Sequence, residues 1–109
     1  MITELSIIIP TLNEEKYLPK LLQSIVKQKF QGKLQVIVVD GASNDNTVNV
    51  AKSFSKSFVD LQVIQTDMGI SGQRNKGVAK AKYEYLLFID ADIILRKNFG
   101  LKIYSFFGK

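Results

Sequence analysis

Four short runs of apolar, β-prone residues alternate along this chain with stretches in which apolar residues recur every three or four positions. The runs cover residues 5–9, 34–39, 61–64 and 86–89. The helical patterns cover about 14–30, 43–58 and 71–81, and a last one carries Leu95, Phe99, Ile103 and Phe106. Strands that alternate with helices form βαβ units with right-handed crossovers. We therefore predict an α/β fold, a doubly wound and mainly parallel sheet of about four strands with helices on both faces.

Polar residues mark the expected starts of the first two helices. Asn13 is a candidate N-cap for the first helix, which we expect to begin near Glu14, and Pro19 in its early turns allows a kink. Three capping candidates precede the second helix: Ser43, Asn44 and Asp45. For Asp45 we favour this capping role over a contact with a ligand.

Composition limits the classes of function. With 109 residues the chain is expected to form one domain, residues 1–109. It contains no cysteine and no histidine, which excludes a disulfide framework, a thiolate site and the commonest zinc ligand and general base. The net charge of +5 suits anionic partners such as nucleotide phosphates or an acidic membrane surface. The lysines are scattered and form no nucleic-acid-binding arm, so no nucleic acid is expected as a partner.

The start of the chain bears on its location. The first four residues lack a basic region, and no apolar run approaches the roughly 18 residues of a membrane span. We therefore expect a cytoplasmic protein, with peripheral attachment to the inner membrane face as an alternative.

The fourth apolar run ends in two carboxylates, Asp90 and Asp92, with Ala91 between them. A short run that is apolar at successive positions suits a strand buried on both faces. At its end the two aspartates point the same way, with Cα atoms about 6.5 Å apart. Two such charges repel by roughly 3 kcal/mol at an effective dielectric constant of about 20, whereas a divalent cation such as Mg²⁺ or Mn²⁺ reverses that sign. The alternative is that one aspartate caps the next helix and the other lies in solvent.

Ligands of a doubly wound sheet bind beyond the carboxyl ends of its strands. Three polar loops are expected there, residues 10–14, 40–45 and 90–92. In the second loop, Asp40 is open either to capping a helix or to holding a ribose. A further stretch, residues 69–77, combines glycines and cations near a helix N-terminus, which suits phosphates or base edges; the alternative is a glycine-rich turn and a solvated basic helix. Its spacing matches neither the dinucleotide-binding fingerprint nor the P-loop.

Four motifs follow one another along the chain: residues 9–15 (IPTLNEE), 38–47 (VVDGASNDNT), 72–77 (GQRNKG) and 90–92 (DAD). In this order they resemble the donor-binding half of the family 2 glycosyltransferases, which have the GT-A fold, over residues 5–107. The resemblance implies a nucleotide-diphosphate sugar as donor and, usually, Mg²⁺ or Mn²⁺. It also implies a chain that is truncated relative to the full family fold.

The same resemblance implies which residues bind the donor: Pro10, Thr11, Leu12, Glu14, Val39, Asp40, Arg74, Asp90 and Ala91. Asp40 would accept a hydrogen bond from a ring N–H of the base, and Arg74 would lie near the base or the diphosphate. Asp90 would lie beside the ribose and the metal, and Asp92 would ligate the metal directly. Where this chain has Leu12, many relatives have a tyrosine.

No carboxylate follows Asp92, whereas the family places its general base and acceptor-recognition elements beyond the Asp-x-Asp strand. We therefore identify no catalytic base in the chain, expect it beyond Lys109, and expect the acceptor-binding half to be absent. The expected function is metal-dependent binding of a nucleotide sugar for glycosyl transfer to an unknown acceptor, a saccharide or a lipid phosphate. The alternative is a non-catalytic nucleotide-binding or interaction module.

Apolar residues crowd the last part of the chain, between Leu95 and Phe107. They exceed what one helix stripe needs, and an open sheet edge beside such a patch tends to pair with another chain. The sequence therefore predicts a homodimer through the C-terminal region.

Overall fold

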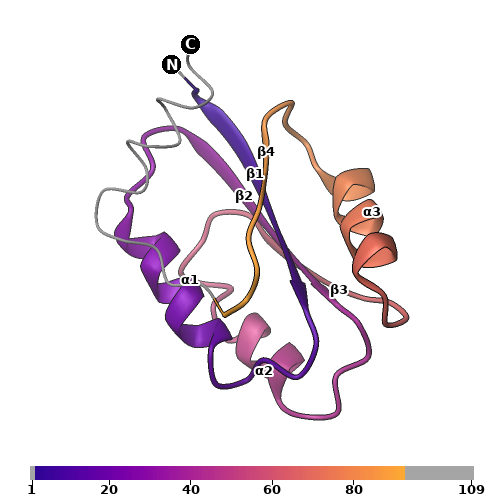
Figure 1. The fold of residues 1–109 in the computed structure, drawn as a ribbon. Helices are drawn as coiled ribbons and strands as arrows, with labels where there is room; N and C mark the ends of the chain where they lie inside the picture. Colours follow the sequence, from indigo (N-terminus) through magenta and orange to yellow (C-terminus); the bar gives the residue numbers. More distant parts are fainter. Residues whose placement is uncertain (1, 93–109) are drawn as a thin grey trace.

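The computed structural model describes residues 2–92, and Figure 1 shows how they fold. The described chain alternates between strands and helices: β1 (Glu4–Thr11), α1 (Leu18–Lys27), β2 (Lys33–Asp40), α2 (Thr47–Lys52), β3 (Leu61–Gln65), α3 (Ile70–Lys80) and β4 (Leu86–Phe88). The last predicted helix and the predicted dimer surface follow Asp92 and lie outside the described residues.

The strands form one parallel sheet in the order β3-β2-β1-β4. β1 and β2 pair at the centre, from Glu4 opposite Lys33 to Thr11 opposite Asp40. β3 pairs with the free side of β2, and β4 pairs with the free side of β1. The predicted parallel α/β sheet is therefore confirmed. The order of the strands reverses at β1, and such a reversal opens a crevice at the carboxyl edge of a sheet.

Helices cover both faces of the sheet, as predicted (Figure 1). On one face, Leu21 of α1 lies in a core with Ile7 of β1 and Val36 of β2, and α2 contributes Ala51 to it. α3 packs on the opposite face, over a smaller core: Ile8, Ile37 and Val39. Neighbouring residues of a strand point to opposite faces, so a strand covered on both sides is apolar at successive positions. Within residues 2–92, no helix is long and apolar enough to cross a membrane.

β4 differs from its prediction. The sequence suggests that this strand is buried on both faces, but it forms one edge of the described sheet, and Phe88 is 42% exposed. The guanidinium of Arg74 lies over the Phe88 ring, 5.8 Å from its centroid. An apolar run of this length fits a central or an edge strand equally well. β1 and β2 occupy the centre, where each pairs with a strand on both sides.

The first helix begins later than predicted, at Leu18 rather than near Glu14. The prediction that Asn13 caps it is wrong: Asn13 has a left-handed backbone (φ 53°), and its side-chain oxygen accepts a hydrogen bond from the Asn44 N–H (2.8 Å). Pro19 lies in the first turn of α1, where helical N–H groups have no intrahelical acceptor, so it fits without a kink.

The second helix is shorter than predicted and ends at Lys52, followed by turns over residues 53–57. The N-cap is Asn46, which is none of the three capping candidates and makes no side-chain capping bond. Asp45 lies one residue earlier, and its Oδ1 accepts a hydrogen bond from the N–H of Thr47, the first helical residue (2.9 Å). Asp45 Oδ1 also accepts from the Thr47 hydroxyl, which lowers the pKa of Asp45 below its ordinary value.

A buried polar pair joins the centre of the sheet to the loop between α3 and β4. Ser6 Oγ donates a hydrogen bond to Gln35 Oε1 (2.6 Å), and Gln35 Nε2 donates to the carbonyl oxygen of Lys80 (3.0 Å). The N–H of Lys82 donates to Gln35 Oε1 (2.8 Å). Across residues 2–92, every buried side-chain nitrogen or oxygen has a partner. Gln35 thereby fixes the C-terminal end of α3 against β2, near the amino edge of the sheet.

Gly77 allows α3 to lie close to the sheet. A Cβ atom at this position would lie 2.4 Å from Cγ2 of Ile8 and 3.3 Å from Cγ2 of Val39. Both neighbours are fully buried β-branched residues of the central strands, so neither can move aside easily. Gly77 therefore sets the distance between the helix and the sheet.

We expect Gly77→Ala to lower the free energy of unfolding by about 1–3 kcal/mol, the usual cost of overpacking a core. Gly72→Ala is the matched control, because a Cβ there meets no atom within 4 Å and alanine favours an exposed helix by up to about 1 kcal/mol. Urea unfolding followed by circular dichroism measures both. Equal stabilities of Gly77→Ala and the wild type would contradict the close approach.

Candidate functional site

A cavity of about 330 Å³ lies at the carboxyl edge of β1 and β4, the edge at which the sequence predicts a ligand site. It brings together most of the predicted site residues: Pro10, Thr11, Leu12, Glu14, Asp90, Ala91 and Asp92. The remaining lining residues come from the start of α3 and the turn before it: Met68, Gly69, Ile70 and Gln73. Segments from both ends of the described chain meet here because parallel strands end at the same edge.

Val39 and Asp40 do not line the cavity, but each is bonded to a residue that does. Thr11 Oγ1 donates a hydrogen bond to Asp40 Oδ1 (2.7 Å), and Gln73 Nε2 donates to the carbonyl oxygen of Val39 (2.9 Å). Asp40 is only 1% exposed and also accepts hydrogen bonds from the hydroxyl and the N–H of Ser43 (2.6 and 2.8 Å). Asp40 therefore holds the turn after β2 as well as the end of β1.

The loop after β1 is hydrogen-bonded to side chains of the loop after β2 and of the first residue of α2. The N–H of Asn13 donates to Ser43 Oγ (2.8 Å), and the N–H of Glu14 donates to Thr47 Oγ1 (2.8 Å). The loop after β1 thus leaves the sheet without regular structure and still has partners for these backbone groups. This wall of the cavity is held by hydrogen bonds within the protein itself.

Three carboxylates lie on the cavity wall: Glu14, Asp90 and Asp92. Burial raises the pKa of Glu14 above its ordinary value of 4.5, and the charges of Asp92, Asp45 and Asp90 raise it further. The aspartates are exposed and sit at the end of β4. This part of the cavity therefore has an excess of negative charge.

Carboxylate oxygens are the ligands that Mg²⁺ and Mn²⁺ prefer, so the donor set at this rim fits a hard divalent cation. Within residues 2–92, however, no three acidic, histidine or cysteine side chains are grouped closely enough to hold a metal ion. Mg²⁺ commonly uses one or two protein carboxylates and takes its other ligands from substrate phosphates and water. Asp90 and Asp92 suit that incomplete kind of site.

Arg74 lies beside the acidic rim, outside the cavity lining. Its Nη2 is 3.9 Å from Asp90 Oδ1, and both side chains are about half exposed or more, at 45% and 63%. An exposed ion pair at this distance contributes little to stability. The Arg74 guanidinium is held in place by the Phe88 ring and remains available to an anion at the rim.

A family model matches the sequence over most of its length. The model described as glycosyl transferase family 2 matches residues 6–109, nearly the whole chain. The chain belongs to glycosyl transferase family 2. The resemblance carried by its four motifs is therefore confirmed.

Curated relatives of this family 2 chain are longer proteins. Poly(ribitol-phosphate) beta-N-acetylglucosaminyltransferase TarS from Staphylococcus aureus (strain Mu50) is 35% identical over 96 residues, which cover 85% of this chain and 17% of TarS. A PGL/p-HBAD biosynthesis glycosyltransferase from Mycobacterium bovis (strain BCG) is 40% identical over 89 residues, which cover 80% of this chain and 34% of that enzyme. The chain thus spans a minor part of the length of each.

Solved structures show the same arrangement. S. aureus TarS in complex with UDP-GlcNAc superposes with a TM-score of 0.86 at 32% identity, over 96% of this chain and 31% of that one. A mannosyltransferase from Pyrobaculum calidifontis in complex with GDP-Man and Mn²⁺ gives a TM-score of 0.79 at 27% identity, over 86% of this chain and 29% of that one. The family 2 chain therefore has the fold of one portion of these GT-A enzymes.

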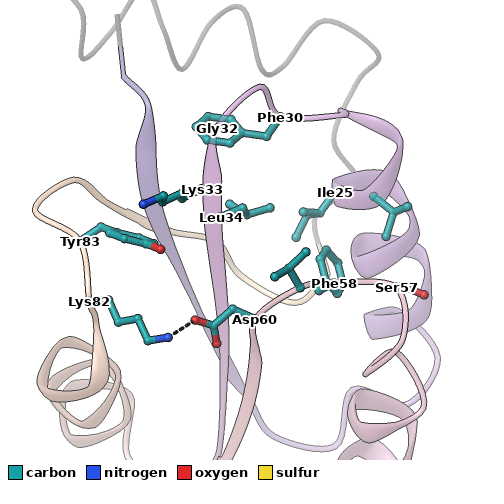
Figure 2. Close-up of a pocket in the computed structure, with 12 residues that line it drawn as sticks. Ile25, Phe30, Gly32, Lys33, Leu34, Ser57, Phe58, Asp60, Lys82 and Tyr83 are labelled. Carbon is teal, nitrogen blue, oxygen red and sulfur yellow. Dashed lines mark hydrogen bonds and ion pairs between the residues drawn. The ribbon is translucent and has the colours of Figure 1, made fainter.

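A larger cavity, of about 750 Å³, lies at the amino edge of the sheet (Figure 2). Phe30, Leu34 and Phe58 line it, and the dashed line in Figure 2 joins Lys82 Nζ to Asp60 Oδ2 (2.6 Å). Asp60 raises the pKa of Lys82, mainly through this hydrogen bond and then through its charge. None of the predicted site residues of the family 2 domain lies here, so the smaller cavity at the carboxyl edge is the candidate site.

Four lining residues are not among the predicted donor-binding residues: Met68, Gly69, Ile70 and Gln73. The last three do fall in the stretch 69–77, which the sequence marks as suited to phosphates or base edges. Met68 and Gly69 are exposed residues of the turn before α3, and Ile70 is the exposed first residue of α3, so their residue types alone do not indicate that they line a cavity. Gln73 is different, because it is 3% exposed, and it shares with Gly77 the stripe of α3 that faces the sheet. A polar residue on the buried stripe of a helix indicates a specific hydrogen-bond partner, and this signal is present in the sequence.

The raised pKa of Glu14 predicts a pH-dependent effect on stability. The folded chain disfavours the ionised form of Glu14, so an ionised Glu14 lowers the free energy of unfolding. At a pH where Glu14 is protonated in both the folded and the unfolded chain, it has no such effect. In EDTA, Glu14→Gln should therefore raise the thermal midpoint near pH 7, and the gain should disappear below about pH 4. Glu84→Gln, at the amino edge, is the control for the change in charge. A gain from Glu14→Gln that persists unchanged in acid would exclude this origin.

Proposed function

We propose that this chain forms the nucleotide-sugar-binding domain, residues 1–109, of a metal-dependent glycosyltransferase. The observation that carries the proposal is the meeting of Asp90 and Asp92 with the loop after β1 around one cavity at the carboxyl edge. Two of the similar structures support it, since TarS was solved with UDP-GlcNAc and the P. calidifontis mannosyltransferase with GDP-Man and Mn²⁺.

Asp92, with Asp90 beside it, would hold the Mg²⁺ or Mn²⁺ ion. A divalent cation at this position supplies charge neutralisation for the nucleoside diphosphate that leaves during glycosyl transfer. The negative charges of the two aspartates repel each other and Glu14. A divalent cation would offset this repulsion and would in turn attract the negatively charged diphosphate. Arg74 would contact the diphosphate or the base, because its guanidinium is exposed next to the same carboxylates.

The base and the ribose would lie along the wall formed by Pro10, Thr11, Leu12 and Glu14, with Ala91 at its end. Asp40 has the hydrogen-bonding capacity for a ring N–H of the base. Its Oδ1 accepts from the hydroxyls of Thr11 and Ser43, whereas its Oδ2 accepts, among residues 2–92, from the Ser43 N–H alone. A carboxylate oxygen has two acceptor positions, so Oδ2 has one left.

Turnover needs an acceptor, a saccharide or a lipid phosphate, and a general base. The curated relatives are much longer than this chain. The general base and the acceptor site would lie in a part of the enzyme that corresponds to their additional residues. Donor hydrolysis in the presence of Mn²⁺ distinguishes a catalytic domain from a domain that only binds the nucleotide.

Asp92→Ala should remove the metal dependence of nucleotide binding. For the wild type we expect calorimetry to show tighter binding of UDP or GDP with Mn²⁺ than with EDTA, because the cation bridges the diphosphate and the carboxylates. For Asp92→Ala the two conditions should give the same dissociation constant. Glu84→Ala removes an exposed carboxylate at the amino edge and should behave as the wild type. Equal wild-type affinities with Mn²⁺ and EDTA would exclude the metal role.

Asp40→Asn should weaken nucleotide binding by about 1–3 kcal/mol, the cost of a mispaired buried hydrogen bond. The amide presents a donor where the base needs an acceptor. Asp60→Asn, a change of the same kind at the amino edge, should leave the affinity unchanged. Circular dichroism checks that both variants fold. An unchanged dissociation constant for a folded Asp40→Asn would leave Asp40 with only its role in holding the turn.

A further inference from the structure

The side chain of Gln73 joins three segments at the floor of the candidate site. Its Nε2 donates hydrogen bonds to the carbonyl oxygens of Thr11, at the end of β1, and of Val39, near the end of β2 (both 2.9 Å). Its Oε1 accepts a hydrogen bond from the N–H of Gly69, the residue that precedes α3 (3.1 Å). Both N–H groups of the carboxamide are used, and the side chain is almost fully buried.

Gly69 and Gln73 are also bonded through the backbone. The N–H of Gln73 donates to the carbonyl oxygen of Gly69 (2.8 Å), so the two residues exchange hydrogen bonds across the first turn of α3. The segment 68–70, at the start of α3, is thereby hydrogen-bonded to the same carboxamide as the ends of β1 and β2. The end of β1 and residues 68–70 both line the cavity, whereas the end of β2 lies behind it.

The main chain around Gln73 leaves just enough room for its carboxamide. A Cβ atom at Gly41, the residue after β2, would lie 2.6 Å from Gln73 Oε1 and 2.8 Å from its Cδ. The absence of a side chain at Gly41 is therefore what lets Gln73 reach both strands. The N–H of Gly41 in turn donates to the carbonyl oxygen of Thr11 (2.9 Å), which Gln73 also contacts.

Gln35 provides a natural comparison. It is a second buried glutamine that bonds α3 to the sheet, but it acts at the other end of the helix and lines neither cavity. The two glutamines have similar burial and similar numbers of partners. A role in stability alone would make them equivalent, whereas only Gln73 contacts the walls of the candidate site.

We propose that Gln73 is a positioning residue for the donor: it sets the spacing between the wall of Pro10 to Leu12 and the wall of Met68 to Ile70. This inference rests on the proposed nucleotide-sugar site. A nucleoside diphosphate that bridges the two walls binds tightly only if they are already at the right separation, because any ordering on binding reduces the affinity. Gln73 provides that order through hydrogen bonds to backbone atoms of both walls.

The test compares Gln73→Met with Gln35→Met. Methionine has nearly the length of glutamine and cannot make the hydrogen bonds, so each variant loses one fixed end of α3. Thermal midpoints should fall in both. The dissociation constant of UDP with Mn²⁺, measured by calorimetry below both midpoints, should rise about tenfold or more for Gln73→Met and stay within about twofold for Gln35→Met. If GDP is the nucleotide that the wild type binds, GDP replaces UDP.

The outcomes separate this inference from the proposed function. A Gln73→Met chain that is folded and binds as tightly as the wild type overturns the positioning role and leaves the nucleotide site intact. Equal losses of affinity in both variants also overturn it, because they indicate a general effect of stability. A wild type that binds neither UDP nor GDP overturns both proposals. If Gln73→Met does not fold, Gln73→Asn, which is too short to reach both carbonyl oxygens, is measured under the same criteria.

Discussion

The parallel pairing of β1 with β2 is the constraint on which the rest of the described structure depends. Its register places Thr11 opposite Asp40, so the two loops that follow leave the sheet side by side. Each loop then supplies hydrogen-bond partners that the other lacks, and the Asp40 carboxylate accepts from both. Backbone groups in irregular loops are costly to bury without partners. The exchange between the loops allows both to stay irregular beside a cavity.

Much of this arrangement is encoded locally. Apolar runs in β1 and β2 and helical spacing in α1 and α3 suffice to predict the elements, and right-handed crossovers then fix a parallel sheet. The parallel sheet places the loops after β1, β2 and β4 at one edge, so a site containing Glu14, Asp90 and Asp92 follows from topology. The order of the motifs identified the family. The structure then added which of these residues line one cavity and which lie behind it.

The features that the sequence did not predict depend on contacts between distant residues. Asn13 has a good capping side chain, but its side-chain oxygen accepts a hydrogen bond from Asn44 in the loop after β2. The local sequence pattern around Asn13 does not predict this distant partner. The position of β4 at an edge of the described sheet depends on which strands pair with each other, and a strand's own sequence does not specify this. Gln73 acquires its role from Thr11, 62 residues away, and a buried polar residue on a helix does not reveal what it bonds. Local patterns give the elements, and tertiary hydrogen bonds decide their exact ends.

The pairing of β4 with β1 has a consequence for the order of folding. It joins residues about 80 positions apart through a strand of only three residues, beginning with Ser6 opposite Leu86. The loop-closure entropy of such a contact is large and few hydrogen bonds offset it, so we expect it to form after β1 and β2 have assembled. Among the strands of residues 2–92, β4 is the shortest and pairs on one side only, so we expect it to open more readily than β1 and β2. The placement of the two aspartates after it then depends on this late contact, and amide exchange at β4 would report how often that placement is lost.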